Sequence, residues 1–363
     1  MIKKFRRKNS GFMRRSSRIF LIDLNKNKTK KLTEFLQLYA QIVRYFIEMF
    51  WSTKSFSNSL AKKEITDKAV EKYGVTARLS QLAAKQAKEI ILSQGKKSGC
   101  KKRMPKFKHI SVNLDSRFFK LSEFNGSFDM ALTLSSGFPK LTVPFNQTKH
   151  TNKFWGAGWV LSKSIRMGIQ KKKIYIDLIY EKEKPKLKEI GEVTGCDLGY
   201  RVPIALSSGE LIGEELKPKI VKSGKRRKSF HHYVQTELNR FVKQIDLSNI
   251  KVLVLEKLKN VKGYKRGKFS RKINRLLSFW HYARVINSLR LICEEFGIRM
   301  EFKSPWKTSQ RCPVCGKIDR RNRRDTEFKC TRCDYKNHAD TVGALNLKSL
   351  GLAGVYSLRL LPK

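Results

Sequence analysis

Four of the seven cysteines form two Cys-x2-Cys pairs, Cys312/Cys315 and Cys330/Cys333, with 14 residues between the pairs. Two pairs at this spacing, each on a tight turn, can give four thiolates to one tetrahedral Zn²⁺ ion and leave no position open for chemistry. The pattern therefore predicts one structural zinc ion that stabilises a small module with little core of its own. His338 follows the last cysteine and is expected at a loop or the edge of a site, because four thiolates already complete the zinc shell.

Three acidic residues stand beside segments with the apolar pattern of buried elements. Asp197 ends an apolar strand, Glu256 ends the strand KVLVL, and Asp340 opens an apolar helical stretch. Taken one at a time, each position is typical of a turn or capping residue. Strand ends hold side chains rigidly, however, and three converging carboxylates make an oxygen-rich site suited to hard cations such as Mg²⁺. Two such ions about 3.5–4 Å apart can activate a water molecule and stabilise the leaving 3′-oxygen of a phosphodiester.

Positive charge dominates the composition. The chain has 363 residues, with 79 Lys+Arg against 30 Asp+Glu and a formal net charge of +49. Self-repulsion on this scale destabilises a compact state unless a polyanion neutralises it, so nucleic acid is the expected partner. Because 40% of the residues are hydrophobic, the chain can still bury a core, which argues against wholesale disorder.

The sequence predicts neither membrane insertion nor secretion. The most apolar candidate, residues 32–51, is interrupted by Glu34, Arg44 and Glu48, whereas a bilayer span needs roughly 18 apolar residues. The basic N-terminus has no apolar stretch behind it, unlike a secretory signal. An odd number of cysteines argues against a secreted disulfide framework. These features predict a cytoplasmic protein without a membrane partner.

The first half of the chain is predicted to be a β-rich module with a helical insertion. Helical spacing of apolar residues over 32–51 and 76–94 predicts two helices. A β-like run at 18–24 and short alternating runs between residues 113 and 182 predict strands. Together they indicate a small β-barrel that is interrupted by helices. The charged stretch 181–189 is expected to be a linker.

The second half alternates between strands and helices. Strands and helices are expected, in chain order, within 192–213 (two strands), 217–245 (a helix in its later part), 251–255 (strand), 270–296 (helix) and 298–302 (strand). An alternation of this kind is typical of βαβ units. It places Asp197 and Glu256 at strand ends.

The order of these features resembles an RNase H-like nuclease. In such nucleases the first Asp lies on the first strand, the Glu on a later neighbouring strand, and the last Asp on a helix packed against both. A zinc ribbon immediately before the third acid is similar to the TnpB family, the transposon-encoded RNA-guided DNA endonucleases of the IS200/IS605 type and relatives of the type V CRISPR effectors. The segments GCDLGYRVPIALSSG, VLVLEKLKNV and HADTVGALNL look like the three RuvC motifs of that family, and TS-x2-Cys-x2-Cys-Gly at 308–316 resembles its zinc-finger region.

The resemblance implies a mixed multi-domain fold. It predicts an RNase H-like (RuvC) α/β nuclease domain with an inserted zinc ribbon, preceded by a β-barrel wedge domain with an inserted helical recognition domain. The implied boundaries are 1–24 and 113–182 for the wedge, 25–112 for the recognition insertion, 183–308 and 337–350 for the nuclease domain, 309–336 for the ribbon and 351–363 for a C-terminal tail. Specific motifs carry the resemblance over about residues 190–350, and in residues 1–189 it is architectural.

The resemblance also implies an activity and partners. The protein would be an RNA-guided DNA endonuclease in which Asp197, Glu256 and Asp340 are catalytic and hold two Mg²⁺ ions, while one Zn²⁺ is structural. A guide RNA from the transposon end, double-stranded target DNA next to a short adjacent motif, and a transposase encoded by the same element are the expected partners. Base pairing would supply specificity and the protein a positive channel. Residues expected to contact nucleic acid are the basic ones after Gly224 (Lys225, Arg226 and Arg227), Lys265, Arg266, Arg323 and Arg324.

Some positions depart from the family pattern, and other functions compete with this one. Asp334 replaces the Gly that usually follows the second cysteine pair, and Val342 and Gly343 stand where the family tends to have Asn and Ala. A miniature type V CRISPR effector would share every motif above. A nuclease-inactive RNA-guided regulator would have a broken set of acids, whereas all three are present here. A direct DDE-type transposase would have its acids in the order Asp, Asp, Glu, which differs from the order in this chain.

Overall fold

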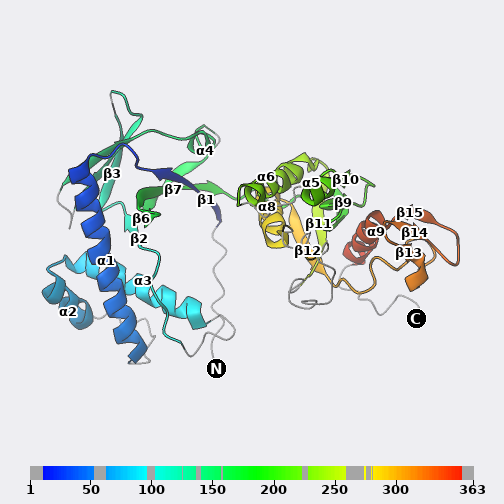
Figure 1. The fold of residues 1–363 in the computed structure, drawn as a ribbon, viewed down its shortest axis with the longest axis horizontal. Coiled ribbons are helices and arrows are strands. Elements are labelled where there is room, and N and C mark those ends of the chain that lie inside the picture. The colour runs from blue at the N-terminus through cyan, green and yellow to red at the C-terminus, as the bar shows by residue number, and fades with distance from the viewer. Residues whose placement is uncertain are drawn as a thin grey trace. The chain divides into compact units, whose positions relative to one another are not determined.

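The computed structural model describes residues 11–52, 63–95, 103–124, 126–135, 140–156, 158–222, 228–258, 274, 279 and 281–353. The chain forms two compact units, residues 1–183 and 184–363, and the division falls within the charged stretch 181–189. Both units combine helices with sheets (Figure 1), so the predicted α/β, multi-domain character is confirmed. Among the helices of the described residues, none is long and apolar enough to cross a membrane.

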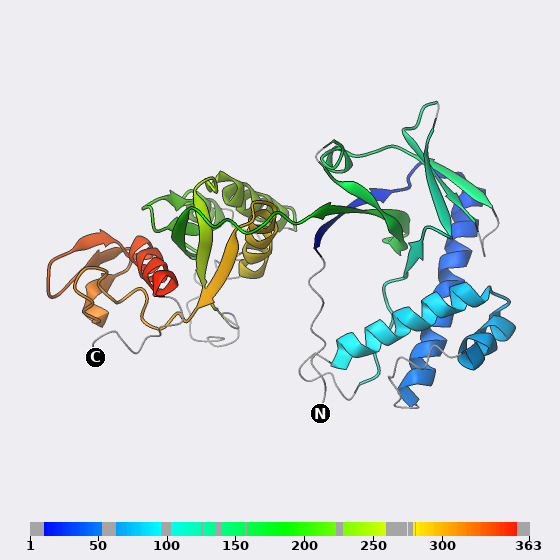
Figure 2. The same cartoon turned by 180° about the vertical axis from the view of Figure 1, so that it is seen from behind.

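Two long helices dominate the N-terminal unit. Helix α1 (Lys26–Ser52) begins earlier than its apolar pattern predicts, because the Asn25 side chain accepts a hydrogen bond from the Lys28 amide at 2.8 Å and caps its first turn. The apolar stripe of α1 is buried and packs against α3 (Ala77–Gly95), which crosses it (Figure 2). A shorter helix, α2 (Lys63–Tyr73), precedes α3 and was missed by the sequence pattern.

The strands of the N-terminal unit form two hydrogen-bonded sheets. The first is antiparallel with the order β1 (Phe12–Phe20), β7 (Lys173–Glu183), β6 (Val160–Gln170) and β2 (Ser111–Asp115). The second has the order β3 (Phe119–Glu123), β4 (Met130–Leu134) and β5 (Leu141–Phe145), followed by the short helix α4 (Lys149–Asn152). Helices α1, α2 and α3 all lie between β1 and β2 in the chain. The expected closed barrel stays a prediction, since the described strands are paired as two sheets.

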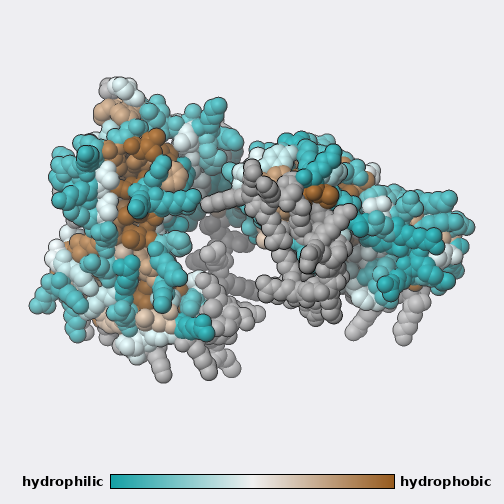
Figure 3. Space-filling view, in the orientation of Figure 1, coloured by the Kyte–Doolittle hydropathy of each residue, from teal (hydrophilic) through white to brown (hydrophobic). Residues whose placement is uncertain are grey.

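The bounds of β1 differ from the sequence expectation. The alternation of apolar residues predicts a strand over 18–24, but β1 pairs with β7 from Phe12 opposite Glu183 to Phe20 opposite Tyr175. Long-range pairing therefore decided its bounds. Arg18 on this strand donates two hydrogen bonds to Asp177 on β7, at 2.7 and 2.8 Å. On the face drawn in Figure 3, hydrophobic residues gather in a band near α1. The surface residues around the C-terminal ribbon are mostly hydrophilic on this face.

A five-stranded mixed sheet is the centre of the C-terminal unit. Its order is β10 (Leu211–Ile212), β9 (Ile204–Leu206), β8 (Glu192–Asp197), β11 (Ile250–Glu256) and β12 (Arg299–Lys303). Strands β8, β11 and β12 run parallel, whereas β9 and β10 are antiparallel to their neighbours. The strand at 251–255, predicted from KVLVL, is therefore β11, and its interior residues are buried on both faces.

Alternate residues of β11 face different helices. Leu253 and Leu255 belong to one core cluster with residues of α5 (Leu216–Lys222), α6 (Lys228–Gln244) and α8 (Tyr282–Glu295). Val252 and Val254 pack instead with Leu347 of α9 (Ala339–Leu352). Because successive side chains of a strand point to opposite faces, α9 covers the face of the sheet that α6 and α8 leave open.

A small ribbon is inserted between β12 and α9. It contains a 3-10 turn, η2 (Arg320–Asn322), and the antiparallel strands β13 (Arg323–Arg324), β14 (Glu327–Lys329) and β15 (Lys336–His338). Phe328 is 1% exposed and packs with two of the cysteines and with Val342 of α9. The ribbon is therefore seated on the N-terminal half of α9.

Candidate active site and zinc centre

Two of the three predicted carboxylates lie at one edge of the central sheet. Asp197 is the last residue of β8 and Glu256 the last residue of β11. These strands are parallel, and Cys196 stands opposite Leu255 in their register. Since the carboxyl ends of parallel neighbours meet at the same sheet edge, the two acidic side chains are brought together although 58 positions separate them in the chain.

The third carboxylate comes from the helix that covers this edge. Asp340 lies in the first turn of α9 and is 8% exposed. Helix α9 approaches β8 closely, because a Cβ atom on Gly195 would lie 1.9 Å from the carbonyl oxygen of Ala344. A Cβ atom on Gly343 would lie 2.7 Å from Oδ2 of Asp197. Glycine at these two positions lets the turn of α9 that follows Asp340 rest directly on the strand that carries Asp197.

The three acids influence one another electrostatically. Burial raises the pKa of Asp197 well above its usual value, and the negative charges of Glu256 and Asp340 raise it further. The pKa of Glu256 is also raised, first by burial and also by Asp340, while the Thr308 hydroxyl and the Arg323 guanidinium oppose the increase. Negative charges gathered in this way make a site where a divalent cation would be strongly stabilised.

Three neighbouring side chains hold the acidic groups. Arg323, from β13 of the ribbon, donates to Oδ1 of Asp340 at 2.9 Å. The Thr308 hydroxyl donates to Oε1 of Glu256 at 2.6 Å. The Tyr282 hydroxyl donates to the main-chain oxygen of Glu256 at 2.7 Å. Sequence reasoning gave no role to Thr308 or Tyr282; the available signal was the position of Thr308 in the TS-x2-Cys-x2-Cys segment.

The carboxylates are close but do not form as compact a group as the cysteines. Within the described part of the chain, the four cysteines are the only group of three or more potential ligands whose donor atoms all lie within 4.8 Å of one another. If all three acids bound one ion, their oxygen atoms would have to lie closer together than they do here. Two ions allow a wider spacing of the carboxylates, since the ions themselves lie roughly 3.5–4 Å apart in two-metal sites. The donor set, oxygen atoms only, is the one that Mg²⁺ prefers.

A polar cavity of about 360 Å³ opens beside Asp340. Its lining comes from the turn after β8, from the loop leading into the ribbon and from the ribbon itself: Gly199, Tyr200, Arg201, Gln310, Arg320, Arg323, Asp325 and Asp340. Two of these residues are carboxylates, and Asp325 forms an ion pair with Arg201. The three arginines of the lining could hold a phosphate group next to bound cations. Arg323 both lines this cavity and contacts Asp340, so it connects the acidic cluster with the other arginines of the cavity wall.

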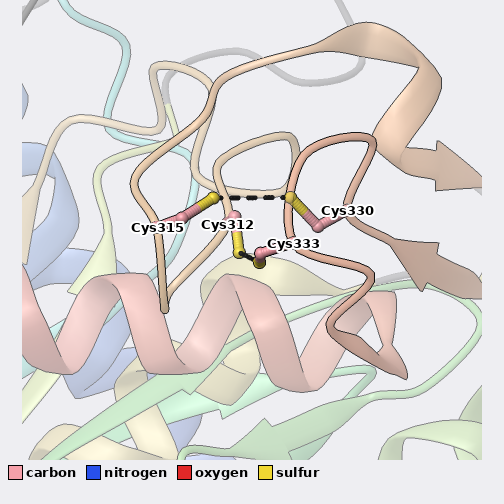
Figure 4. Close-up of side chains that lie close together, drawn as sticks. All are labelled: Cys312, Cys315, Cys330 and Cys333. Carbon is pink, nitrogen blue, oxygen red and sulfur yellow. Dashed lines mark hydrogen bonds between the residues drawn. The ribbon is translucent and has the colours of Figure 1, made fainter.

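The four predicted zinc ligands converge in the ribbon (Figure 4). Sγ of Cys312 lies 3.6 Å from Sγ of Cys333, and Sγ of Cys315 lies 3.5 Å from Sγ of Cys330. A regular tetrahedron with Zn–S bonds of about 2.3 Å has S–S edges of about 3.8 Å. A disulfide would need about 2.05 Å, so the spacing fits four ligands around one zinc ion and not two disulfides.

The protonation of these thiols is uneven. Burial raises the pKa of Cys312 to about 12. Burial also acts to raise the pKa of Cys330, but hydrogen bonds from the Arg332 and Cys333 amides outweigh it and lower that pKa to about 7. Amides that stabilise a thiolate are typical of knuckle turns, and a zinc ion binds cysteine in the thiolate form.

The remaining predicted residues have different outcomes. His338 is the N-cap of α9, and its Nδ1 accepts from the Asp340 amide at 3.3 Å, which agrees with a place at the edge of the site. Arg324 is exposed on β13. The basic residues after Gly224 (Lys225, Arg226 and Arg227) and Lys265 and Arg266 lie outside the described residues.

Comparisons with known proteins agree with the motifs. A family model described as "Cas12f1-like, TNB domain" matches residues 282–347, which run from α8 through the ribbon to α9. A CRISPR-associated endodeoxyribonuclease Cas12f1 of an uncultured archaeon is 30% identical over 99 residues, which are 25% of this chain and 19% of that protein. A TnpB-like protein of Aquifex aeolicus (strain VF5) is 22% identical over 208 residues, 56% of this chain and 60% of that protein. The matches span less than two thirds of the length of either relative.

A solved structure shows the fold. The chain in a cryo-electron microscopy structure of a Cas12f1–sgRNA–target DNA complex matches with a TM-score of 0.61 at 13% identity, over 93% of this chain and 99% of that one. The similarity extends through both units and is not limited to the segment with recognisable motifs. The resemblance to TnpB proteins and miniature type V effectors, predicted from residues 190–350, is confirmed.

Proposed function

We propose that this chain, a relative of the TnpB-like and Cas12f1 proteins, is an RNA-guided DNA endonuclease that cuts target DNA next to a short adjacent motif. Asp197, Glu256 and Asp340 form its cleavage centre. The observation that carries the proposal is the convergence of these acids, from β8, β11 and α9, beside a cavity lined by arginines. The strand order of the central sheet, with the first acid on β8 and the second on the neighbouring β11, supports an RNase H-like nuclease domain.

The chain's own residues have distinct roles in this proposal. The three carboxylates would hold two Mg²⁺ ions, which when bound supply an activated water molecule and stabilise the leaving 3′-oxygen. Arg323, which donates one hydrogen bond to Asp340 and lines the cavity, would also bind a phosphate oxygen of the substrate. Arg201 and Arg320, on the cavity wall, would hold the neighbouring phosphates of a single strand.

The zinc centre would have no part in the chemical step. Four thiolates close the coordination shell, so the ion would stabilise the ribbon and thereby position Arg323 beside the carboxylates. The guide RNA, expressed from the transposon end, would select the target strand by base pairing, and the excess of positive charge would bind its backbone.

The test starts from the RNA that the protein binds. The chain is purified from cells that carry its native locus, the copurified RNA is sequenced, and a plasmid library is prepared with the complementary sequence flanked by randomised positions. With Mg²⁺ the wild type should cut a subset of plasmids that share an adjacent motif. Asp197→Ala, Glu256→Ala and Asp340→Ala should leave plasmids intact while guided binding survives.

Each alternative has its own outcome in this experiment. Guided binding without cleavage by the wild type would replace the endonuclease by an RNA-guided regulator. Absence of a defined copurified RNA would leave a basic nucleic-acid-binding protein. RNA made of repeat-derived sequence would point to a miniature type V effector of a CRISPR locus.

Salt dependence gives a second measurement of the interface. If about four phosphates are neutralised, affinity for the target should fall roughly tenfold for each doubling of salt concentration. A flat profile would show that the positive charge of the chain lies away from the bound nucleic acid.

A further inference from the structure

The shortest side-chain contact of the acidic cluster comes from a neutral residue. Thr308 is 5% exposed, and its hydroxyl donates to Oε1 of Glu256 at 2.6 Å. A second acceptor, the carbonyl oxygen of Pro305, lies at 3.4 Å, so the hydroxyl proton is directed to the carboxylate. The two residues are far apart in the chain, because Thr308 lies in the loop that leads from β12 into the ribbon, 52 positions after Glu256.

The position of Thr308 is itself fixed by a buried amide. Asn346, on α9, is 4% exposed, and its Nδ2 donates to the carbonyl oxygens of Thr308 and Arg311, both at 2.8 Å. One side chain of α9 thus holds both ends of the loop segment that presents the hydroxyl. The same helix carries Asp340, so this network connects the strand with the second acid to the helix with the third.

The network continues into the zinc ribbon. Asn322 donates from Nδ2 to the carbonyl oxygen of Gln310 at 2.9 Å, and its Oδ1 accepts from the Thr331 amide at 2.9 Å. Gln310 precedes the first cysteine pair and Thr331 lies within the second. The side chain of Asn322 therefore joins the two knuckles to the loop that holds Thr308.

We infer that Thr308 is a positioning residue, which fixes the carboxylate of Glu256 in the orientation that metal binding requires and couples that orientation to the folded zinc ribbon. The inference rests on the proposed nuclease function of this site. Glu256 stands at a strand end, and its carboxyl group can rotate about the terminal side-chain torsion, which is broad in glutamate. Repulsion from Asp197 and Asp340 favours a rotated, separated arrangement. The hydroxyl opposes this rotation without adding a charge that would compete with a cation.

The test compares two substitutions of one side chain in the full-length protein with its copurified RNA. Thr308→Val keeps the shape but removes the donor, and Thr308→Ser restores the donor. Loss of an outer partner of a metal ligand typically costs 10- to 100-fold in metal affinity or activity. We therefore expect Thr308→Val to raise the Mg²⁺ concentration for half-maximal cleavage about 10- to 100-fold, and Thr308→Ser to remain within a few-fold of the wild type.

A control in the same module separates positioning from folding. The Thr331 hydroxyl donates to Asn322 at 3.1 Å, within the ribbon. Thr331→Val removes a hydroxyl bond by the same substitution and should lower the melting temperature while leaving the Mg²⁺ dependence unchanged. Zinc content is measured for each variant. If Thr308→Val matches the wild type in Mg²⁺ dependence, or if Thr308→Ser fails to restore it, the inference is wrong.

A binding measurement distinguishes this failure from failure of the proposed function. Mn²⁺ binding to the whole chain is followed by electron paramagnetic resonance, with Asp197→Asn as the reference that lacks the site. If Thr308→Val binds Mn²⁺ more weakly than the wild type and the wild type cuts no DNA, the positioning role is supported and the proposed nuclease activity is overturned. If the wild type cuts DNA under guidance and Thr308→Val binds Mn²⁺ with the wild-type affinity, the nuclease function is supported and the positioning role of Thr308 is overturned. A Thr308→Val protein that loses zinc as well would assign Thr308 to ribbon stability and overturn the inference.

Discussion

The zinc ribbon and the carboxylate cluster are adjacent in space but are assembled differently. All four cysteines come from residues 312–333, on two tight turns, and their sulfur atoms already have the spacing of a tetrahedral site. The three acids come from β8, β11 and α9, and they lie together only because a parallel strand pair and a covering helix bring them there. Ligands that are close in the chain, such as the cysteines, are brought together by two turns. Ligands that are far apart in the chain, such as the acids, are brought together only when the whole core of their unit folds.

The two sites also differ in what they contribute to stability. Thiolates around zinc form a closed, satisfied shell that gives a small module its folding energy. The acids are held close against their mutual repulsion, and burial and like charges raise the pKa of Asp197. Functional sites commonly have such unfavourable electrostatics, which the surrounding structure must offset. Bound zinc would thus stabilise the ribbon, whereas the like charges of the three acids destabilise the carboxylate cluster.

Loss of zinc should have the largest effect. Structural zinc contributes roughly 10–16 kcal/mol of apparent binding free energy in small zinc modules. Chelation, or Cys330→Ser, should abolish bound zinc and open the ribbon to protease, while the N-terminal unit stays folded. Elemental analysis and limited proteolysis measure this. Cys293→Ala, at a buried cysteine outside the cluster, should keep its zinc, and an unchanged zinc content in Cys330→Ser would rule out the proposed site.

Substitution of one acid should nearly abolish cleavage and leave zinc binding and guided nucleic-acid binding intact. Asp340→Asn keeps the size of the side chain but weakens the binding of cations, and a loss of several kcal/mol in the transition state corresponds to at least about 10³-fold in rate. Zinc content and guided binding should be unchanged. Asp334→Asn, at an exposed acid of the ribbon, is the matched control and should cut at the wild-type rate; comparable cutting by Asp340→Asn would remove that residue from the centre.

A methyl group at Gly195 should disturb the acids and leave the cysteines intact. Its Cβ would lie 1.9 Å from the Ala344 carbonyl oxygen, so α9 must move away from β8. Overpacking of this kind costs typically about 1–3 kcal/mol. Gly195→Ala should therefore lower the melting temperature and slow cleavage, because Asp340 moves with its helix. Gly95→Ala, where a Cβ meets nothing within 4 Å, should change neither; an equal melting temperature for both variants would mean that the contact is relieved without cost.

The smallest expected effect is a change in melting temperature, and its sign should differ between the carboxylate cluster and the zinc ribbon. In a buffer that removes divalent cations, Asp197→Asn should raise the melting temperature by a few degrees, because it removes one of three repelling charges; 1 kcal/mol corresponds to about 2–4 °C in a protein of 150–250 residues. Removing a zinc ligand lowers stability instead. Calorimetry with and without Mg²⁺ measures the difference. A lower melting temperature for Asp197→Asn would contradict the view that the acids destabilise the fold.

Prediction from the sequence was most accurate where the signal is local. The grouping of the four cysteines and the strand at 251–255 could both be read from short segments, since each depends on the pattern of its immediate neighbours. The catalytic role of the three acids stays a prediction. The early part of β1 and helix α2 were missed, because their apolar residues are few and long-range pairing or packing decides their bounds. Gly343 was noted only as a departure from a family pattern, yet it stands against Asp197.

The residue types and their spacing determined by themselves which groups can bind metal: four thiols that suit zinc, and three carboxylates at the ends of buried elements that suit hard cations. The tertiary structure alone decided what surrounds those carboxylates. That Arg323 contacts Asp340, that Thr308 holds Glu256 and that α9 touches β8 through glycine are relations between residues far apart in the chain. Such contacts depend on strand register and on the distance between a helix and a sheet, and both are set only when the whole core packs.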